Sequence, residues 1–247
     1  MIVETKRIGE TTREFAKRIS LKNNGEKVCI CGKLDPMSRG ITRILIGGET
    51  KLMKNYLNSD KIYEFSIVCG ISTDSDDIMG LIDSDTVSDS INRFRYIDLI
   101  KEYMVNTLKT TTQKYHHYSA ICIKKDENNK KPLWYWYRKG ILKEEDIPEK
   151  KATVYSVDHI NSKFVDKQTY LDMVLYRLNT VTDTETFKID LIKEKWIDAI
   201  DFKLTKIHML TYRLNVSSGF YIRMIAKDIK NKLQIPVHIF DINRVGI

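Results

Sequence analysis

The most constraining feature of this sequence is a change of hydrophobic period near residue 218. Between residues 204 and 217 apolar and polar side chains alternate, which is typical of a strand with one buried face. The apolar side of this strand holds Leu210, Tyr212, Leu214 and Val216. After Ser218 and Gly219 the spacing becomes helical, with apolar residues at Ile222, Ile225, Ile229 and Leu233. We therefore expect a half-buried strand that runs through a turn into an amphipathic helix.

Shorter patterns of both kinds occur in the rest of the chain. They predict helices at 10–20 and 91–109, strands at 27–31 and 62–71, and a strand at 118–123 that pairs across a charged turn at 124–131. Strands and helices do not alternate regularly, so the sequence favours an α+β fold over a doubly wound sheet. The 247 residues form one large domain or two small ones, without an internal repeat.

Charge favours a polyanionic partner. Lys and Arg number 41 against 33 Asp and Glu, which gives a net charge of +8. This charge is compatible with a nucleic-acid partner, but many basic proteins have none, so both possibilities remain open. No apolar stretch approaches the roughly 20 residues that span a bilayer, and the first residues do not resemble a secretory signal, so we expect no membrane association. Four cysteines are too few for a disulfide framework, which indicates a reducing compartment, cytoplasmic or nuclear.

Several catalytic motifs are excluded by their spacing. The cysteines lack zinc-ligand spacing, and the His116-His117 pair has no cysteine or carboxylate at metal spacing. The acidic segment 73–80 lacks the closing Glu of a calcium loop, and 47–51 lacks the spacing of a phosphate-binding loop. No Ser lies in a Gly-x-Ser-x-Gly setting. We expect no metal site.

Asp35 is the most unusual carboxylate. It precedes Pro36 in a segment bracketed by glycines at 32 and 40, and the proline favours an extended backbone at Asp35. Asp35 is either a turn former or an ionised nucleophile or base, and Lys33 and Arg39 are suited to hold phosphates beside it. The aromatic run 134–138 has two interpretations as well, base stacking or packing.

Eight ordered blocks resemble the TruB family of pseudouridine synthases, which isomerise a uridine in the T-loop of tRNA. The first reads Gly-Lys-Leu-Asp-Pro-Met-Ser-Arg-Gly-Ile and is similar to the family's G-x-L-D-P-x-A-x-G-V-L, with Asp35 on the catalytic aspartate. Tyr63 lies in a block similar to K-x-Y, and Arg223 in one similar to C-S-x-G-T-Y-I-R. The blocks lie at 32–41, 46–51, 61–65, 70–77, 118–120, 134–140, 217–223 and 237–244.

The resemblance implies a pseudouridine synthase fold: a mixed, mainly antiparallel sheet with flanking helices, in a single catalytic domain over 1–247. It implies Asp35 as nucleophile or base, Tyr63 stacked on the flipped uracil, and Arg223 paired with Asp35. The remaining implied site residues are Tyr221 and Ile242 lining the pocket and Lys33, Arg39 and Lys61 binding RNA. It also implies no cofactor, a monomer, and RNA, above all tRNA, as partner.

The departures from the family pattern are specific. Ile30 or a neighbour replaces the family's histidine before the catalytic block, and Thr5-Lys6-Arg7 stands where the family has D-K-P. Residues 160–203 are additional to the family's short hairpin, and the chain ends at Ile247 without the small C-terminal RNA-binding domain of many bacterial members. Two alternatives therefore stay open: an RNA-binding or RNA-folding module with weakened catalysis, and a synthase for messenger or guide-directed RNA.

Overall fold

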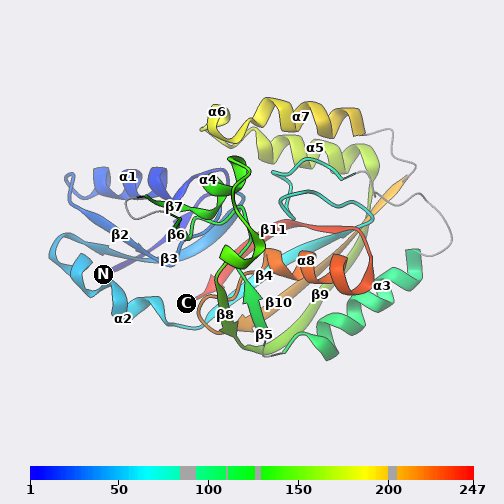
Figure 1. Cartoon of the computed structure of the whole chain (residues 1–247), viewed down its shortest axis with the longest axis horizontal. Helices are drawn as coiled ribbons and strands as arrows, with labels where there is room; N and C mark the ends of the chain where they lie inside the picture. The colour runs from blue at the N-terminus through cyan, green and yellow to red at the C-terminus, as the bar shows by residue number, and fades with distance from the viewer. Residues whose placement is uncertain (84–92, 110, 126–128, 200–204) are drawn as a thin grey trace.

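A long mixed sheet organises the protein in its computed structural model, which describes residues 1–83, 93–109, 111–125, 129–199 and 205–247 (Figure 1). Its strands are β1 (Ile2–Lys6), β2 (Val28–Cys31), β3 (Ser38–Ile46), β4 (Lys61–Cys69), β9 (Val154–Asp166), β10 (Lys206–Val216) and β11 (Val237–Gly246). Within the described residues they form one seven-stranded sheet in the order β1-β3-β11-β4-β10-β9, with β2 also paired to β3. Its pairs are antiparallel except β3 with β11, so the expected mixed, mainly antiparallel sheet is confirmed.

Helices and two small hairpins surround this sheet. The helices are α1 (Thr12–Lys22), α2 (Met53–Leu57), α3 (Arg93–Glu102), α4 (Leu133–Arg138), α5 (Lys167–Leu178), α6 (Thr184–Phe187), α7 (Ile189–Asp198) and α8 (Arg223–Leu233). Single turns of other helix types cover Gly47–Leu52, Tyr103–Thr107 and Glu144–Asp146. The two small sheets pair β5 (Thr111–Lys114) with β8 (Glu149–Ala152), and β6 (Cys122–Lys124) with β7 (Lys130–Pro132).

Two apolar cores lie on opposite faces of β4 and β10. The first core packs α3 and α8 against the predicted apolar side of β10, whose four residues Leu210, Tyr212, Leu214 and Val216 are fully buried. The second core packs α5 and α7 against side chains that point the other way, Val68 and Met209 among them. The sheet is therefore buried on both faces at its centre, and the period-two pattern of the sequence reports only the first face.

The N-terminal part of the sheet has its own covering helix. Phe15 and Ile19 of α1 pack on Ile44 of β3. Thr11 caps the helix: its side chain accepts a hydrogen bond from the Glu14 amide, and Glu14 accepts one from the Thr11 amide. Such a capping box fixes the start of a helix, which explains why a short amphipathic pattern sufficed to predict it.

The segment 160–203 is integrated into the fold. Its first residues continue β9 in the sheet as far as Asp166, and α5 and α7 supply much of the second core. The indole of Trp196, on α7, is buried and donates to the carbonyl of Ile78 at 3.1 Å. The helices α5, α6 and α7 form within this segment, whereas residues 200–203 lie outside the described residues.

Two boundaries differ from those predicted. Residues 118–120 form a turn closed by a hydrogen bond from the Ser119 amide to the His116 carbonyl at 2.9 Å, and the strand begins only at Cys122. The glycine-bracketed segment is shorter as a loop, because β3 already begins at Ser38. Residues 91–92 of the predicted helix and 126–128 of the predicted turn lie outside the described residues. Among the helices described, none combines the length and apolar character needed to cross a membrane.

Candidate active site

Asp35 lies on a loop whose backbone is bound by the buried side chain of Lys6. The Lys6 ammonium is almost completely buried and donates to the carbonyls of Pro36 at 3.2 Å and Ser38 at 2.7 Å. The Gly9 amide also donates to Pro36 at 2.9 Å. Burial lowers the pKa of Lys6 to about 8, although the negative charge of Asp35 opposes the shift. These bonds satisfy the loop's inward carbonyls and fix the backbone on either side of Pro36.

The Asp35 carboxylate is held at one oxygen. Oδ2 accepts from the Tyr221 hydroxyl at 2.9 Å and from Nε of Arg223 at 3.0 Å, and Nη2 of Arg223 lies 3.0 Å away. Among the described residues Oδ1 has no hydrogen-bond partner, and the side chain is 25% exposed. The arrangement holds an ionised carboxylate in one orientation with a lone pair still available, which suits a nucleophile or base.

Arg223 connects Asp35 to the acidic segment after β4. It is the first residue of α8 and is buried, and its Nη1 donates to the carbonyl of Ser75 at 3.0 Å and lies 3.2 Å from Oδ2 of Asp77. Burial alone would lower the pKa of Arg223, but the negative charges of Asp35 and Asp77 and the hydrogen bond to Tyr221 outweigh it and raise the pKa. Arg223 thus stays charged, and the carboxylates of Asp35 and Asp77 both bind this one cation.

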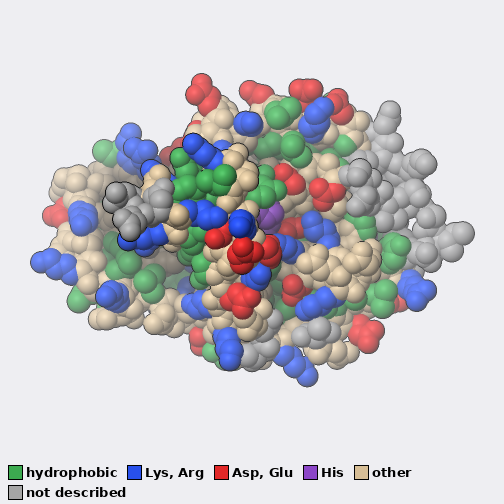
Figure 2. Space-filling view, in the orientation of Figure 1, with side chains coloured by type: hydrophobic (Ala, Val, Ile, Leu, Met, Phe, Trp, Pro, Cys, Tyr) green, Lys and Arg blue, Asp and Glu red, His purple; other side chains and the backbone are tan. Residues whose placement is uncertain are grey.

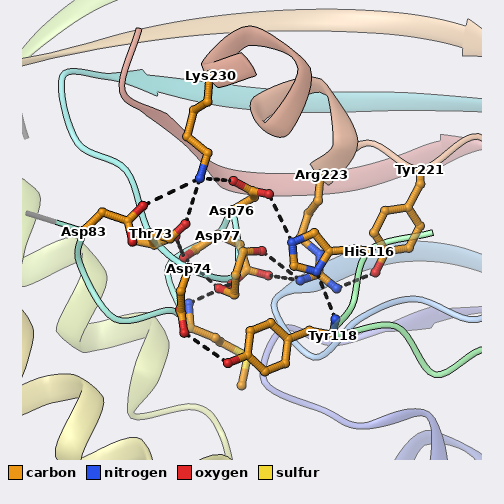
Figure 3. A network of polar contacts seen from close by, with 12 residues as sticks. Thr73, Asp74, Asp76, Asp77, Asp83, His116, Tyr118, Tyr221, Arg223 and Lys230 are labelled. Carbon is orange, nitrogen blue, oxygen red and sulfur yellow. Dashed lines mark hydrogen bonds and ion pairs between the residues drawn. The ribbon is translucent and has the colours of Figure 1, made fainter. Parts of the chain in front are cut away.

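The acidic segment is a tightly bonded turn (Figure 3). Thr73 donates to the carbonyl of Asp77 at 2.7 Å, and Oδ1 of Asp77 accepts from the Ser75 hydroxyl and the Met79 amide. Tyr118 donates to Oδ2 of Asp74 at 3.0 Å. In the part of the chain that is described, no group of three or more His, Cys, Asp or Glu is arranged to hold a metal ion.

The remaining predicted pocket residues lie on neighbouring strands. Tyr63 is on β4 and Ile242 on β11, both are largely buried, and both belong to the first core. Burial raises the pKa of Tyr63, although the charge of Arg244 and a hydrogen bond with it oppose the shift. Burial likewise raises the pKa of Tyr221 well above its ordinary value, so its hydroxyl stays protonated and donates to Asp35. Tyr221 and Arg223 thus contact Asp35, and Tyr63 shares the first core with Leu34, the residue before Asp35.

The three predicted RNA-binding cations differ in availability. Lys33 is exposed beside Asp35. Arg39 is partly exposed and forms an ion pair with Asp241 at 3.0 Å. Lys61 is 6% exposed and its ammonium donates to the backbone carbonyls of Leu57 and Ser59, so it is not an exposed phosphate-binding group. We correct its predicted role to a structural one.

Sequence analysis missed three residues that build the site. Lys6 lies in a segment that departs from the family pattern, and Asp77 lies in the block 70–77, to which no site role was assigned. Arg244 is buried and donates to the carbonyls of Ile41 at 2.7 Å, in β3, and Gly32 at 3.1 Å, at the start of the loop that carries Asp35. For Lys6 and Arg244 the sequence signal is a Lys or Arg within an apolar strand pattern, because a buried cation needs acceptors that the fold must provide.

Two further predictions concern residues beside the site. The aromatic run 134–138 lies in α4, where Trp136 is buried and Tyr137 is 40% exposed. The helix therefore has both a packed and an exposed aromatic side chain. Ile30 packs with the core under α1, on the side of β2 that faces away from its buried neighbour Cys31. A histidine at position 30 would therefore enter an apolar core, so Ile30 is the wrong position at which to restore the family's histidine.

The fold and the sequence place the chain in a known protein family. The chain belongs to the TruB family: the family model described as "TruB family pseudouridylate synthase (N terminal domain)" matches residues 17–175, which include Asp35, Tyr63, Asp77 and the start of the segment 160–203. The chain is similar to tRNA pseudouridine synthase 4 of Saccharomyces cerevisiae, with 26% identity over 96% of this chain and 64% of the relative. It is also similar to tRNA pseudouridine synthase B of Endomicrobium trichonymphae, with 32% identity over 64% of this chain and 66% of the relative.

Solved structures support the fold. A chain in the crystal structure of a Cbf5-Nop10-Gar1 complex superposes with a TM-score of 0.51 and 15% identity, over 97% of this chain and 46% of the other. At this identity the likeness concerns the fold alone. The present chain spans about two thirds of the length of the two curated relatives described above.

Proposed function

We propose that this protein is a tRNA pseudouridine synthase that isomerises a T-loop uridine, with Asp35 as the nucleophile or base. Family membership and the printed names of the relatives support the reaction class and the tRNA substrate. The observation that carries the proposal is the Asp35 carboxylate, which is bound at Oδ2 by Tyr221 and Arg223 and has no partner at Oδ1 among the residues that the structure describes.

The geometry suits the steps of this isomerisation. The C1′–N1 bond breaks, the uracil turns, a C1′–C5 bond forms, and the base loses a proton from C5 while N1 gains one. The product is an isomer of the substrate, so the reaction consumes no cofactor. Asp35 supplies the charged group at the glycosidic centre, and the buried phenol of Tyr63 nearby offers a stacking surface for the flipped base.

The first experiment is incubation of purified protein with unmodified tRNA transcripts, followed by mapping of pseudouridine at single-nucleotide resolution. We expect product at one T-loop uridine. An Asp35→Asn variant should lose product formation by more than about 10³-fold while binding the transcript with unchanged Kd, because the amide keeps the shape but not the charge. Asp98→Asn, at an exposed position on α3, is the matched control and should keep the wild-type rate.

Equal product yield from wild type and Asp35→Asn would refute the assignment of Asp35. Product at another uridine, or only in messenger or guide-directed RNA, would refute the T-loop substrate and keep the chemistry. Binding without any product would favour the second candidate, an RNA-binding or RNA-folding module. That candidate is motivated by the absence of the family's histidine near Ile30.

A further inference from the structure

His116 lies behind the site, in the turn that follows β5, and it is completely buried. Its two ring nitrogens have different partners (Figure 3). Nδ1 lies 3.1 Å from the Tyr118 amide, and Nε2 lies 3.1 Å from Oδ2 of Asp76. A backbone amide can only donate, so Nδ1 accepts; the ring proton is then on Nε2, which donates to Asp76.

The surroundings of His116 keep the ring neutral. Burial lowers its pKa well below the ordinary value, and the positive charges of Arg223, Lys227 and Lys230 act in the same direction. The Asp35 carboxylate opposes them weakly. The imidazole is therefore a fixed donor to Asp76 rather than a charge or a metal ligand.

Asp76 makes several of the contacts that hold the backbone of the acidic turn in place. It has a positive φ of 60°, which is costly for a residue other than glycine unless its surroundings hold it. Its carboxylate is held by His116 at one oxygen and by the Lys230 ammonium, 2.6 Å away, at the other. Its carbonyl accepts from the Ile239 amide at 2.9 Å. Side chains from the β5–β6 connection and α8 thus fix one strained residue.

The strained residue stands between the two groups that bind Arg223. Ser75 precedes Asp76 and offers its carbonyl, and Asp77 follows and offers its carboxylate. A change of φ at Asp76 would reorient both groups relative to the guanidinium. Because Arg223 in turn binds Oδ2 of Asp35, such a change reaches the carboxylate in two hydrogen-bonded steps.

We propose that His116 is a positioning residue for the isomerisation: its Nε2–H holds Asp76 so that the turn grips Arg223 in the orientation that aligns Asp35. This role rests on the proposed function. His116 does not touch Asp35, and its effect should appear in the chemical step rather than in RNA affinity. Its neighbour His117 lies in the same turn, but its Nε2 has no hydrogen-bond partner among the described residues, which makes it the natural control.

The test compares two amides at position 116. In His116→Gln the side-chain NH₂ can still donate to Asp76, whereas in His116→Asn the shorter amide can replace Nδ1 but not the donor at Nε2. We expect His116→Asn to lower the single-turnover rate by about 10- to 100-fold with Kd for the tRNA transcript unchanged. His116→Gln should stay within a few-fold of wild type, and His117→Asn should be unchanged.

A double-mutant cycle identifies Asp76 as the intermediary. Asp76→Ala should lower the rate by itself, and adding His116→Asn should cost little more, because both changes remove the same hydrogen bond. Equal rates for His116→Gln and His116→Asn in folded protein, checked by thermal melting, would overturn the proposal. So would an increase in Kd that accounts for the whole effect.

A measurement on the wild-type protein removes the dependence on folding of the variants. Long-range ¹H–¹⁵N spectra of the imidazole should show the neutral Nε2–H tautomer of His116 at pH 7. The Nδ1–H tautomer or an imidazolium ion would contradict the proposal. Absence of product from wild-type protein on every RNA would instead refute the proposed function, and with it any role of His116 in the reaction.

Discussion

At the scale of single residues, Arg223 decides how the site is oriented. Its guanidinium contacts Asp35, Asp77 and the Ser75 carbonyl and donates to the Tyr221 hydroxyl. These partners come from three separate segments of the chain. A planar group with five donors can serve all of them, whereas an ammonium is a single point of charge.

Arg223→Lys should therefore keep the charge and lose the alignment. We expect the single-turnover rate to fall by about 100-fold or more, because a small displacement of reacting groups is enough for such a loss. The free energy of unfolding should fall by about 1–3 kcal/mol, since buried acceptors lose their donors. Urea denaturation measures the second effect. Arg213→Lys, on an exposed ion pair with Glu64, is the control and should change neither quantity.

A second residue, His238, makes stability depend on pH. Its Nδ1 donates to the Ile71 carbonyl at 2.8 Å and its Nε2 accepts from the Tyr170 hydroxyl at 2.6 Å, so the folded protein holds the ring neutral. Burial lowers the pKa of His238 to about 4, against an ordinary value near 6.5. Below pH 6.5 the unfolded chain binds a proton that the folded chain refuses, so stability falls as pH falls.

Between pH 6.5 and 5 this residue should cost about 2 kcal/mol of the free energy of unfolding. Urea denaturation of wild type and His238→Gln at both pH values isolates its contribution from that of other groups. The wild type should lose about 2 kcal/mol more than the variant, which cannot titrate in this range. Parallel losses in the two proteins would contradict the pKa assigned to His238.

At the scale of elements, α5 and α7 are part of the main architecture. Val174 and Leu178 of α5 are fully buried, and the helices contact both the sheet and the acidic turn. Leu178→Ala should lower the free energy of unfolding by about 2–5 kcal/mol, the usual range for a buried leucine. Tyr176→Ala on the same helix is the control, because Tyr176 is 72% exposed. An unchanged free energy of unfolding in Leu178→Ala would show that α5 and α7 contribute little to the stability of the fold.

The elements divide into those that local sequence specifies and those that it does not. The strand β10 and the helix α8 were predictable because their periods are long and uninterrupted. The turn at 118–120 was not, since its conformation depends on hydrogen bonds from the Tyr118 and Ser119 amides to His116. The acidic turn binds Arg223 through Ser75, a residue 148 positions away in the sequence. Asp35 and Arg223 were paired only through family resemblance, because no local pattern joins them.

At the scale of the whole molecule, the sheet brings together groups that are distant in sequence. The turn after β4 and the start of α8 meet where Arg223 contacts Asp77, as Figure 3 shows, and Arg223 also binds Asp35 on the loop before β3. The surface around them carries both signs of charge, because Lys and Arg side chains are interspersed with Asp and Glu on the face shown in Figure 2. Attraction to RNA should then depend on the excess of +8 and on individual exposed cations near the site.

Binding of tRNA should consequently weaken steeply with salt. With about 6 phosphate contacts, affinity should fall on the order of a thousandfold between 50 and 200 mM salt, because each neutralised phosphate releases bound counterions. Lys33→Gln removes an exposed cation beside Asp35 and should lower the slope of log affinity against log salt by about one. Lys17→Gln, at an exposed position on α1, should leave the slope unchanged if α1 lies off the RNA path. Filter binding at four salt concentrations measures all three slopes, and a salt-independent affinity would show that phosphate contacts do not drive recognition.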